Sequence, residues 1–187
     1  MLSQIITKVR ALIADLVSSD FQIFTYTTSS IFTLAQSNIG SITKVEQNGA
    51  TLDSGDYSWD STTNKLTITA SLTVGDIIVI TFTYYKFSDT EIQANIRSSL
   101  VYMSVYSYSA DEDYEMETND IYPTPGNKDT DVMALIASII IKPIWTEYRT
   151  PTILVRYNRN SDKDEIIKKI IFQAKWAVGS LKIITID

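Results

Sequence analysis

Apolar residues change their spacing twice along the chain. Near the N-terminus they recur every three or four positions, between residues 21 and 86 they alternate or form short β-prone runs, and from residue 87 the helical spacing returns. This pattern predicts an α+β protein with a small bundle of about four helices, residues 1–20 and 87–187. A small antiparallel β-sandwich or barrel, residues 21–86, is expected as an insertion between helices 1 and 2.

The first predicted helix has an apolar stripe that is typical of a core-facing helix. The sequence Ser18-Ser19-Asp20 is expected to end it. Its buried side should comprise Leu2, Ile5, Ile6, Val9, Leu12, Ile13 and Leu16.

The second predicted helix runs from Ser88 to Met103 and is expected to be central to the bundle. Ser88 and Glu91 have the spacing of a capping box, in which each side chain bonds the backbone N–H of the other residue. Its core side should comprise Ile92, Ile96, Leu100 and Met103.

The β block has runs of strand-forming residues separated by turn signals such as Asn48-Gly49. About five or six strands are expected, with runs at 21–27, 42–47, 56–59, 65–69 and 77–85. The last run is the longest. Its uniformly apolar face, which should point to the core of the block, comprises Ile78, Ile80, Phe82 and Tyr84.

A third helix should be capped by Asp129 or Thr130 and should end before Pro143. It is the best candidate for the most buried helix, because apolar residues also occur outside its main stripe. That stripe comprises Val132, Leu135, Ile136, Ile139 and Ile140. Tyr148 is expected in the loop that follows.

Asp162 and Glu165 form a second capping box at the start of the last helix, and Gly179 is a suitable stop. The core side of this helix should comprise Ile166, Ile167, Ile170, Ile171, Ala174 and Ala177. The chain then ends in the apolar, β-prone segment Lys182, Ile183, Ile184, Thr185 and Ile186. Such a segment needs a partner: it either adds a strand to another protein's sheet or pairs with the chain's own run at 153–157.

Composition excludes several kinds of site. The chain has no cysteine and no histidine, so it lacks thiol nucleophiles, zinc–thiolate sites and Ser-His-Asp triads. We therefore expect no enzyme, catalytic residue, cofactor or metal. No apolar run is long enough to span a bilayer, and the N-terminus lacks the pattern of a signal peptide, so a soluble protein made in the cytoplasm of the producing cell is expected.

Charge is distributed unevenly along the chain. The net charge is −6, but residues 142–187 carry a net +4, which leaves −10 on residues 1–141. This distribution suits contacts between copies, although uneven solvated charge is also common. One acidic segment comprises Asp111, Glu112, Asp113, Glu115, Glu117 and Asp120. It lacks the glycine and the closing glutamate of an EF-hand, which favours a solvated loop or a loop ordered by a neighbouring subunit.

The order of these elements resembles that of the head–tail adaptor (connector, or neck) proteins of long-tailed bacteriophages. The resemblance rests on the short amphipathic N-terminal helix, the helix that opens with Phe87-Ser88-Asp89-Thr90-Glu91-Ile92-Gln93, the further helices and the trailing C-terminal segment. It covers residues 1–17 and 87–187. The β block, with Val45-Glu46-Gln47-Asn48-Gly49 and Gly75-Asp76-Ile77-Ile78-Val79, resembles small modules of phage structural proteins and departs from the minimal all-helical adaptor.

The resemblance implies a virion structural protein without catalytic activity. A dodecameric ring would lie below the portal, in the neck between capsid and tail, bind the portal protein and the next neck or tail protein, and extend the DNA channel for genome ejection. Lys182–Ile186 would contact the portal, and the β module would lie on the outer side. Asp111, Glu112, Asp113, Glu115 and Glu117 would line the channel or contact a neighbouring subunit, and DNA would pass an acidic lining without specific binding.

Three alternatives stay open. The β block could bind a surface carbohydrate through Trp59, Tyr57, Tyr84 and Tyr85, although aromatic residues on strands usually belong to cores or interfaces. A carboxylate hydrolase could use two of Asp53, Asp56 and Asp60, although aspartate is also favoured in turns. A phage tail-completion or other neck protein would differ in its partner and not in its chemistry.

Overall fold

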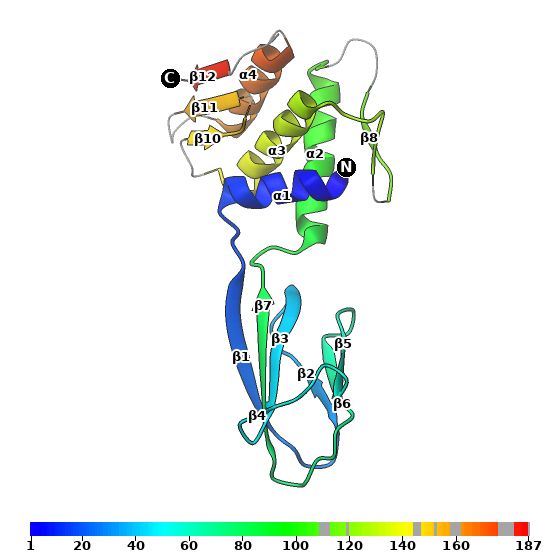
Figure 1. Cartoon of the computed structure of the whole chain (residues 1–187). Coiled ribbons are helices and arrows are strands. Elements are labelled where there is room, and N and C mark those ends of the chain that lie inside the picture. Colours follow the sequence, from blue (N-terminus) through cyan, green and yellow to red (C-terminus); the bar gives the residue numbers. More distant parts are fainter. Residues whose placement is uncertain are drawn as a thin grey trace. The chain divides into compact units, whose positions relative to one another are not determined.

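The chain divides into two compact units (Figure 1). The computed structural model describes residues 1–108, 113–118, 120–143, 147–151, 153–157, 162–175 and 182–186. One unit, the helical unit, comprises Met1–Asp15 and Asp89–Asp187; the other, the β unit, comprises Leu16–Ser88. The described residues form four helices and several antiparallel sheets, so the fold class is mixed α+β.

Helix α1 (Leu2–Ile13) buries the predicted side chains Leu2, Ile5, Ile6, Val9 and Ile13. It ends earlier than the sequence predicted. Ala14 adopts a left-handed conformation with φ 52° and ψ 44°, its N–H bonds Ala11 O, and Asp15 N–H bonds Arg10 O at 2.9 Å. This hydrogen-bonded stop satisfies the last carbonyls of the helix. Leu16, expected on the buried stripe, therefore lies beyond the helix and is 73% exposed.

Helix α2 (Asp89–Val105) begins directly after Ser88 and buries the expected Ile92, Ile96, Leu100 and Met103. Ser99 is buried beside them, and its hydroxyl donates to Ile96 O at 2.6 Å. Val101 and Val105, on another side of the helix, are exposed.

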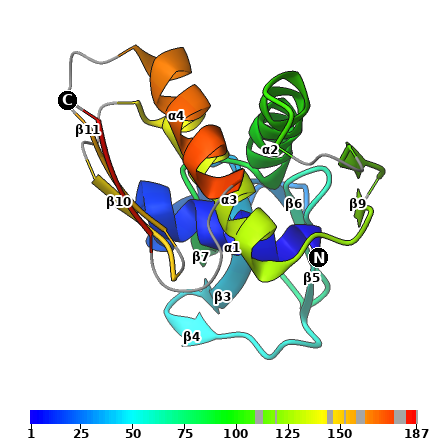
Figure 2. The same ribbon diagram turned by 90° about the horizontal axis from the view of Figure 1, so that it is seen from above.

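Helix α3 (Asn127–Ile141), and not α2, is the centre of the helical unit. Every residue from Thr130 to Ile139 is buried, and α3 packs against α1, α2 and α4 (Figure 2). The expected cap was wrong by a few residues. Gly126 is the N-cap, and Asp129 lies in the first turn, where its carboxylate accepts the Gly126 N–H at 3.1 Å. Gly126 has no capping side chain, so only the half of a capping box that Asp129 supplies is present.

Helix α4 (Lys163–Lys175) begins directly after Asp162, the predicted capping residue. The Asp162 carboxylate accepts the Asp164 N–H at 3.3 Å, and its carbonyl accepts the first helical bond from Ile166 at 3.0 Å. The buried side comprises Ile166, Ile167, Ile170, Ile171 and Ala174. Ala177 and the stop expected at Gly179 lie outside the described residues.

Three strands form a small sheet in the helical unit, in the order β10 (Glu147–Arg149), β11 (Ile153–Tyr157), β12 (Lys182–Ile186). β10 and β11 are antiparallel, whereas β11 and β12 are parallel. Tyr148, expected in a loop, lies in β10 and is only 2% exposed; its hydroxyl donates to Lys142 O. The central strand β11 is buried from Ile153 to Val155.

Seven strands make up two sheets in the β unit. One sheet has the order β1 (Ser18–Thr25), β7 (Ile77–Tyr84), β3 (Ile39–Gln47), β4 (Ala50–Thr51), and the other has the order β2 (Ile31–Thr33), β6 (Lys65–Ile68), β5 (Tyr57–Asp60). The three-residue strand β2 was not predicted. The predicted turn between β3 and β4 is confirmed, with positive φ at Asn48 (52°) and Gly49 (84°).

The two sheets of the β unit share one hydrophobic core. It comprises Phe32, Leu34, Val45, Leu66, Ile68, Ile78, Ile80 and Phe82. The alternation predicted for β7 is confirmed, because Ile78, Ile80 and Phe82 are fully buried while Ile77 is exposed. Tyr84 is half-buried and packs against the same core.

A short hairpin of β8 (Glu115–Met116) and β9 (Ile121–Tyr122) follows α2. Figures 1 and 2 place this hairpin and α4 on opposite sides of α2. Among the described residues, no helix combines the length and the apolar character needed to cross a membrane.

Candidate interaction surfaces

The first surface is the acidic face of the β8–β9 hairpin. Asp113, Glu115 and Glu117 are exposed, whereas Asp111 and Glu112 lie outside the described residues. Glu115 is directly opposite Tyr122 in the antiparallel pair, so the two side chains share one face. Tyr122 is 51% exposed. The hairpin therefore presents a carboxylate and an aromatic ring side by side.

The hairpin is anchored to the start of α3 through Asp129. Its carboxylate accepts hydrogen bonds from the Tyr108 hydroxyl at 2.7 Å and the Tyr114 hydroxyl at 2.9 Å, in addition to the Gly126 N–H. Burial and the bond to Asp129 raise the pKa of Tyr108 well above its usual value. Ile121 is buried on the inner side of the hairpin. These contacts hold the hairpin, and with it the acidic face, in place against the start of α3.

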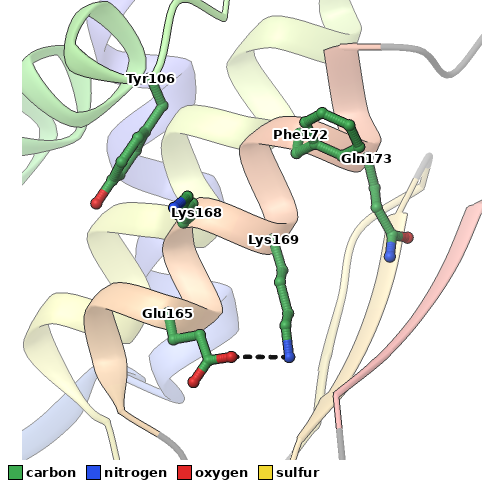
Figure 3. A pocket seen from close by; sticks show the side chains of 6 residues that line it. All are labelled: Tyr106, Glu165, Lys168, Lys169, Phe172 and Gln173. Atoms are coloured by element: carbon green, nitrogen blue, oxygen red, sulfur yellow. Dashed lines mark ion pairs between the residues drawn. The ribbon is translucent and has the colours of Figure 1, made fainter.

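The second surface is a groove between the end of α2 and the outer side of α4 (Figure 3). Its volume is about 380 Å³, and its lining comprises Tyr106, Glu165, Lys168, Lys169, Phe172 and Gln173. The Lys168 ammonium lies 6.0 Å from the centre of the Tyr106 ring, within cation–π range. Lys169 pairs with Glu165 at 3.1 Å. Phe172 is 67% exposed although it is aromatic.

Hydrogen bonds hold the two walls of this groove together. The Tyr102 hydroxyl donates to Asp164 Oδ1 at 2.6 Å, and Tyr102 stacks on Tyr106 with the ring centres 6.3 Å apart. The bond to Asp164 is the main cause that raises the pKa of Tyr102 to about 12. Lys175 Nζ donates to Ser107 O at 2.8 Å. The groove is therefore pre-formed between two connected helices.

Sequence reasoning missed this groove. The available signal was Phe172, which falls outside the isoleucine stripe of α4 and shares the polar side with Lys168 and Lys169. Aromatic residues are enriched at interfaces, so an exposed one on a polar helix face is a signal. The contribution of Tyr106 had no local signal, because this residue lies far from α4 in the sequence, in the turn directly after α2.

The third surface is the C-terminal strand. The structure pairs Lys182–Ile186 with Ile153–Tyr157 of the same chain, which was one of the two alternatives for this segment. β12 is the outer strand of its sheet, and no strand in the described part of the chain pairs with its other side. The segment thus has a partner within the chain, and its other edge is without a strand as far as the described residues go.

A small cavity of about 170 Å³ lies among α1, α3 and residues 149–151. Lys8 Nζ donates to Asp131 Oδ1 and to Thr130 Oγ1, both at 2.6 Å. The Asp131 side chain is 2% exposed and that of Lys8 31%. We interpret this pair as a polar tie between α1 and α3.

In the β unit, the residues of the two alternative functions have structural roles. Tyr57, Trp59 and Tyr84 are half-buried and pack against the core. Asp56 Oδ2 accepts the Asp53 N–H at 3.3 Å. Asp60 accepts the Thr63 hydroxyl at 2.6 Å, which lowers the pKa of Asp60. These are turn contacts.

The two edge strands of the larger β sheet, β1 and β4, differ in length. β4 has only two residues and pairs with Glu46 and Gln47 of β3. The pairing of β3 with β7 has two irregularities, between Ile39 and Ser41 and between Ile42 and Lys44. β1 pairs regularly over all eight residues, and Phe21 and Ile23 are exposed on it. β1 is therefore the edge at which a further strand could pair more readily.

No triad of acidic side chains in the described ranges is arranged to hold a metal ion. No family model matches the chain, and no curated protein matches it either. A functional proposal must therefore rest on the order of the elements and on these surfaces.

Proposed function

We propose that this chain is a virion structural protein that forms a ring below the portal of a long-tailed bacteriophage, joins the capsid to the tail and extends the DNA channel. Its mechanism is assembly, without catalysis. Its partners are further copies of itself, the portal and the next neck or tail protein, and its place is the neck of the virion.

One observation carries the proposal. The helical unit combines both ends of the chain, Met1–Asp15 and Asp89–Asp187, and has two chemically opposite surfaces on opposite sides of α2. A ring needs two different, complementary patches on each subunit, because each copy contacts one neighbour on either side. The acidic hairpin and the Lys168–Phe172 groove are such patches. The order of helices and the trailing strand are consistent with the adaptor resemblance.

The β unit fits this proposal as an inserted module. Its two sheets share one core, which supports a sandwich between α1 and α2. The exposed Phe21 and Ile23 on its β1 edge would contact a neighbouring copy or another neck component.

Two further roles belong to the proposal. The open edge of β12 would accept a strand of the portal, which supplies main-chain hydrogen bonds. The acidic residues of the segment from Asp111 to Glu117 that do not contact a neighbour would line the channel, where like charge prevents DNA from adhering.

The test is mass photometry with negative-stain imaging of the purified chain, alone and mixed with the portal from the same source. Rings, either alone or on the portal, are expected. Rings that bind only tail components would indicate a tail-completion protein. Monomers that bind neither the portal nor tail components would refute the proposal.

A further inference from the structure

The hairpin face offers a compact binding element. Glu115 and Tyr122 are cross-strand neighbours on one face, and both are exposed. Asp113 and Glu117 are exposed close by in the chain. The element thus combines a carboxylate, an aromatic ring and a surplus of negative charge. Hydrogen bonds to Asp129 hold it in place.

The groove between α2 and α4 offers the complementary chemistry. Tyr106 and Phe172 supply aromatic surface, and Lys168 extends beside them. Lys169 is already paired with Glu165, so Lys168 is the ammonium that an incoming carboxylate would meet first. Figure 3 shows Phe172 one helical turn beyond Lys168. A carboxylate and an aromatic ring that enter together would therefore find a cation and an aromatic wall.

The two elements lie on opposite sides of α2 in both views, so they do not meet within one copy (Figures 1 and 2). A contact between them must join two copies. It is heterologous, and its repetition closes a ring when the rotation between subunits permits.

We propose that the β8–β9 hairpin of one copy docks in the α2–α4 groove of the next copy. Glu115 pairs with Lys168, and the Tyr122 ring packs against Phe172. This inference rests on the proposed ring function and names the contact that builds the ring. The occupant is a second copy because the same chain supplies both halves of a charge-complementary and aromatic pair.

The experiment is a charge swap read by mass photometry. Glu115→Lys and Lys168→Glu should each raise the concentration for half-assembly at least about tenfold, as expected when a close ion pair becomes a like-charge contact. The double variant should assemble like the wild type. An equimolar mixture of the two single variants should also assemble, because each hairpin then finds an oppositely charged groove on the other variant. Portal-bound rings are scored in the same way if the wild type assembles only on the portal.

Controls separate the possible failures. Lys65→Glu changes the same charge on an exposed residue of the β unit and should leave assembly unchanged. Circular dichroism verifies that each variant is folded. If both single variants assemble into rings as readily as the wild type, this contact is overturned and the ring function stands. The same holds if the double variant assembles no more readily than the worse single variant. A wild type that forms no ring, alone or with portal, would overturn both.

Discussion

The Tyr102 hydroxyl donates a hydrogen bond to Asp164 Oδ1 at 2.6 Å and thereby ties the last turns of α2 to the first turn of α4. Tyr102→Phe should lower the free energy of unfolding by about 0.5–1 kcal/mol at pH 7, since the site is partly exposed. Urea unfolding followed by circular dichroism measures the loss. Tyr106→Phe keeps the ring stacking and serves as the control.

The same bond predicts a pH dependence. The pKa of Tyr102 is raised to about 12 in the folded protein, against 10.0 for an ordinary tyrosine. The folded state holds the phenolic proton more tightly, so the contribution is complete below about pH 10 and is lost as the pH rises toward 12. The difference in stability between wild type and Tyr102→Phe should be constant from pH 7 to 9 and should shrink above 10. A constant difference up to pH 11 would contradict this assignment.

Asp129 accepts three hydrogen bonds, from Tyr108, Tyr114 and Gly126. Asp129→Asn replaces one accepting oxygen by a donor and should cost about 2–3 kcal/mol, whereas Tyr114→Phe should cost about 1 kcal/mol. Hydrogen exchange at Met116 and Ile121 should become faster in Asp129→Asn, because the anchor of the hairpin is weakened. Equal losses in the two variants would argue against a shared acceptor.

Lys8 and Asp131 form a largely buried pair. Lys8→Met removes a cationic partner of a buried carboxylate and should cost about 2–3 kcal/mol, below the range for fully buried pairs because Lys8 reaches solvent. Asp131→Leu should cost less, since the Lys8 ammonium can turn to water. The double variant should recover part of the loss. A double-mutant cycle in urea would yield no coupling energy if the two side chains acted independently.

Ile77 and Ile80 lie on opposite faces of β7. Ile80 is fully buried and Ile77 is 41% exposed. Ile80→Ala should lower the free energy of unfolding of the β unit by about 2–5 kcal/mol, and Ile77→Ala by less than about 1 kcal/mol. Thermal unfolding of both variants checks the alternation. Similar losses would mean that the outer face of the sheet is also covered.

Two adjacent proline substitutions distinguish the two sides of β12. Successive N–H groups of a strand point to opposite sides, so one of Ile183→Pro and Ile184→Pro removes a donor to β11 and the other removes an outward donor. One variant should be clearly destabilised. The other should remain folded and, under the proposed function, lose binding to the portal in a co-sedimentation assay. Normal portal binding by the stable variant would exclude strand addition at this edge.

Local patterns predicted the elements with strong periodicity. The predicted core sides of α2, from Ile92 to Met103, and of α4, from Ile166 to Ala174, are confirmed. So is the predicted inner face of β7, from Ile78 to Phe82. Spacing alone predicts these faces, because side chains three or four positions apart on a helix, or two apart on a strand, lie on the same side. The end of α1 was wrong, because the left-handed Ala14 and the Arg10–Asp15 ion pair stop the helix without a glycine or proline signal.

The sequence by itself determined the type of each main element, the face that each buries, and the absence of histidine and cysteine chemistry. Only the tertiary structure decided that α3 is central, that β12 pairs with β11, and that Tyr106 joins Lys168 and Phe172 in one groove. The reason is physical. Hydrophobic periodicity is a property of neighbouring residues, whereas strand partners and grooves depend on which distant surfaces bury the most apolar area together.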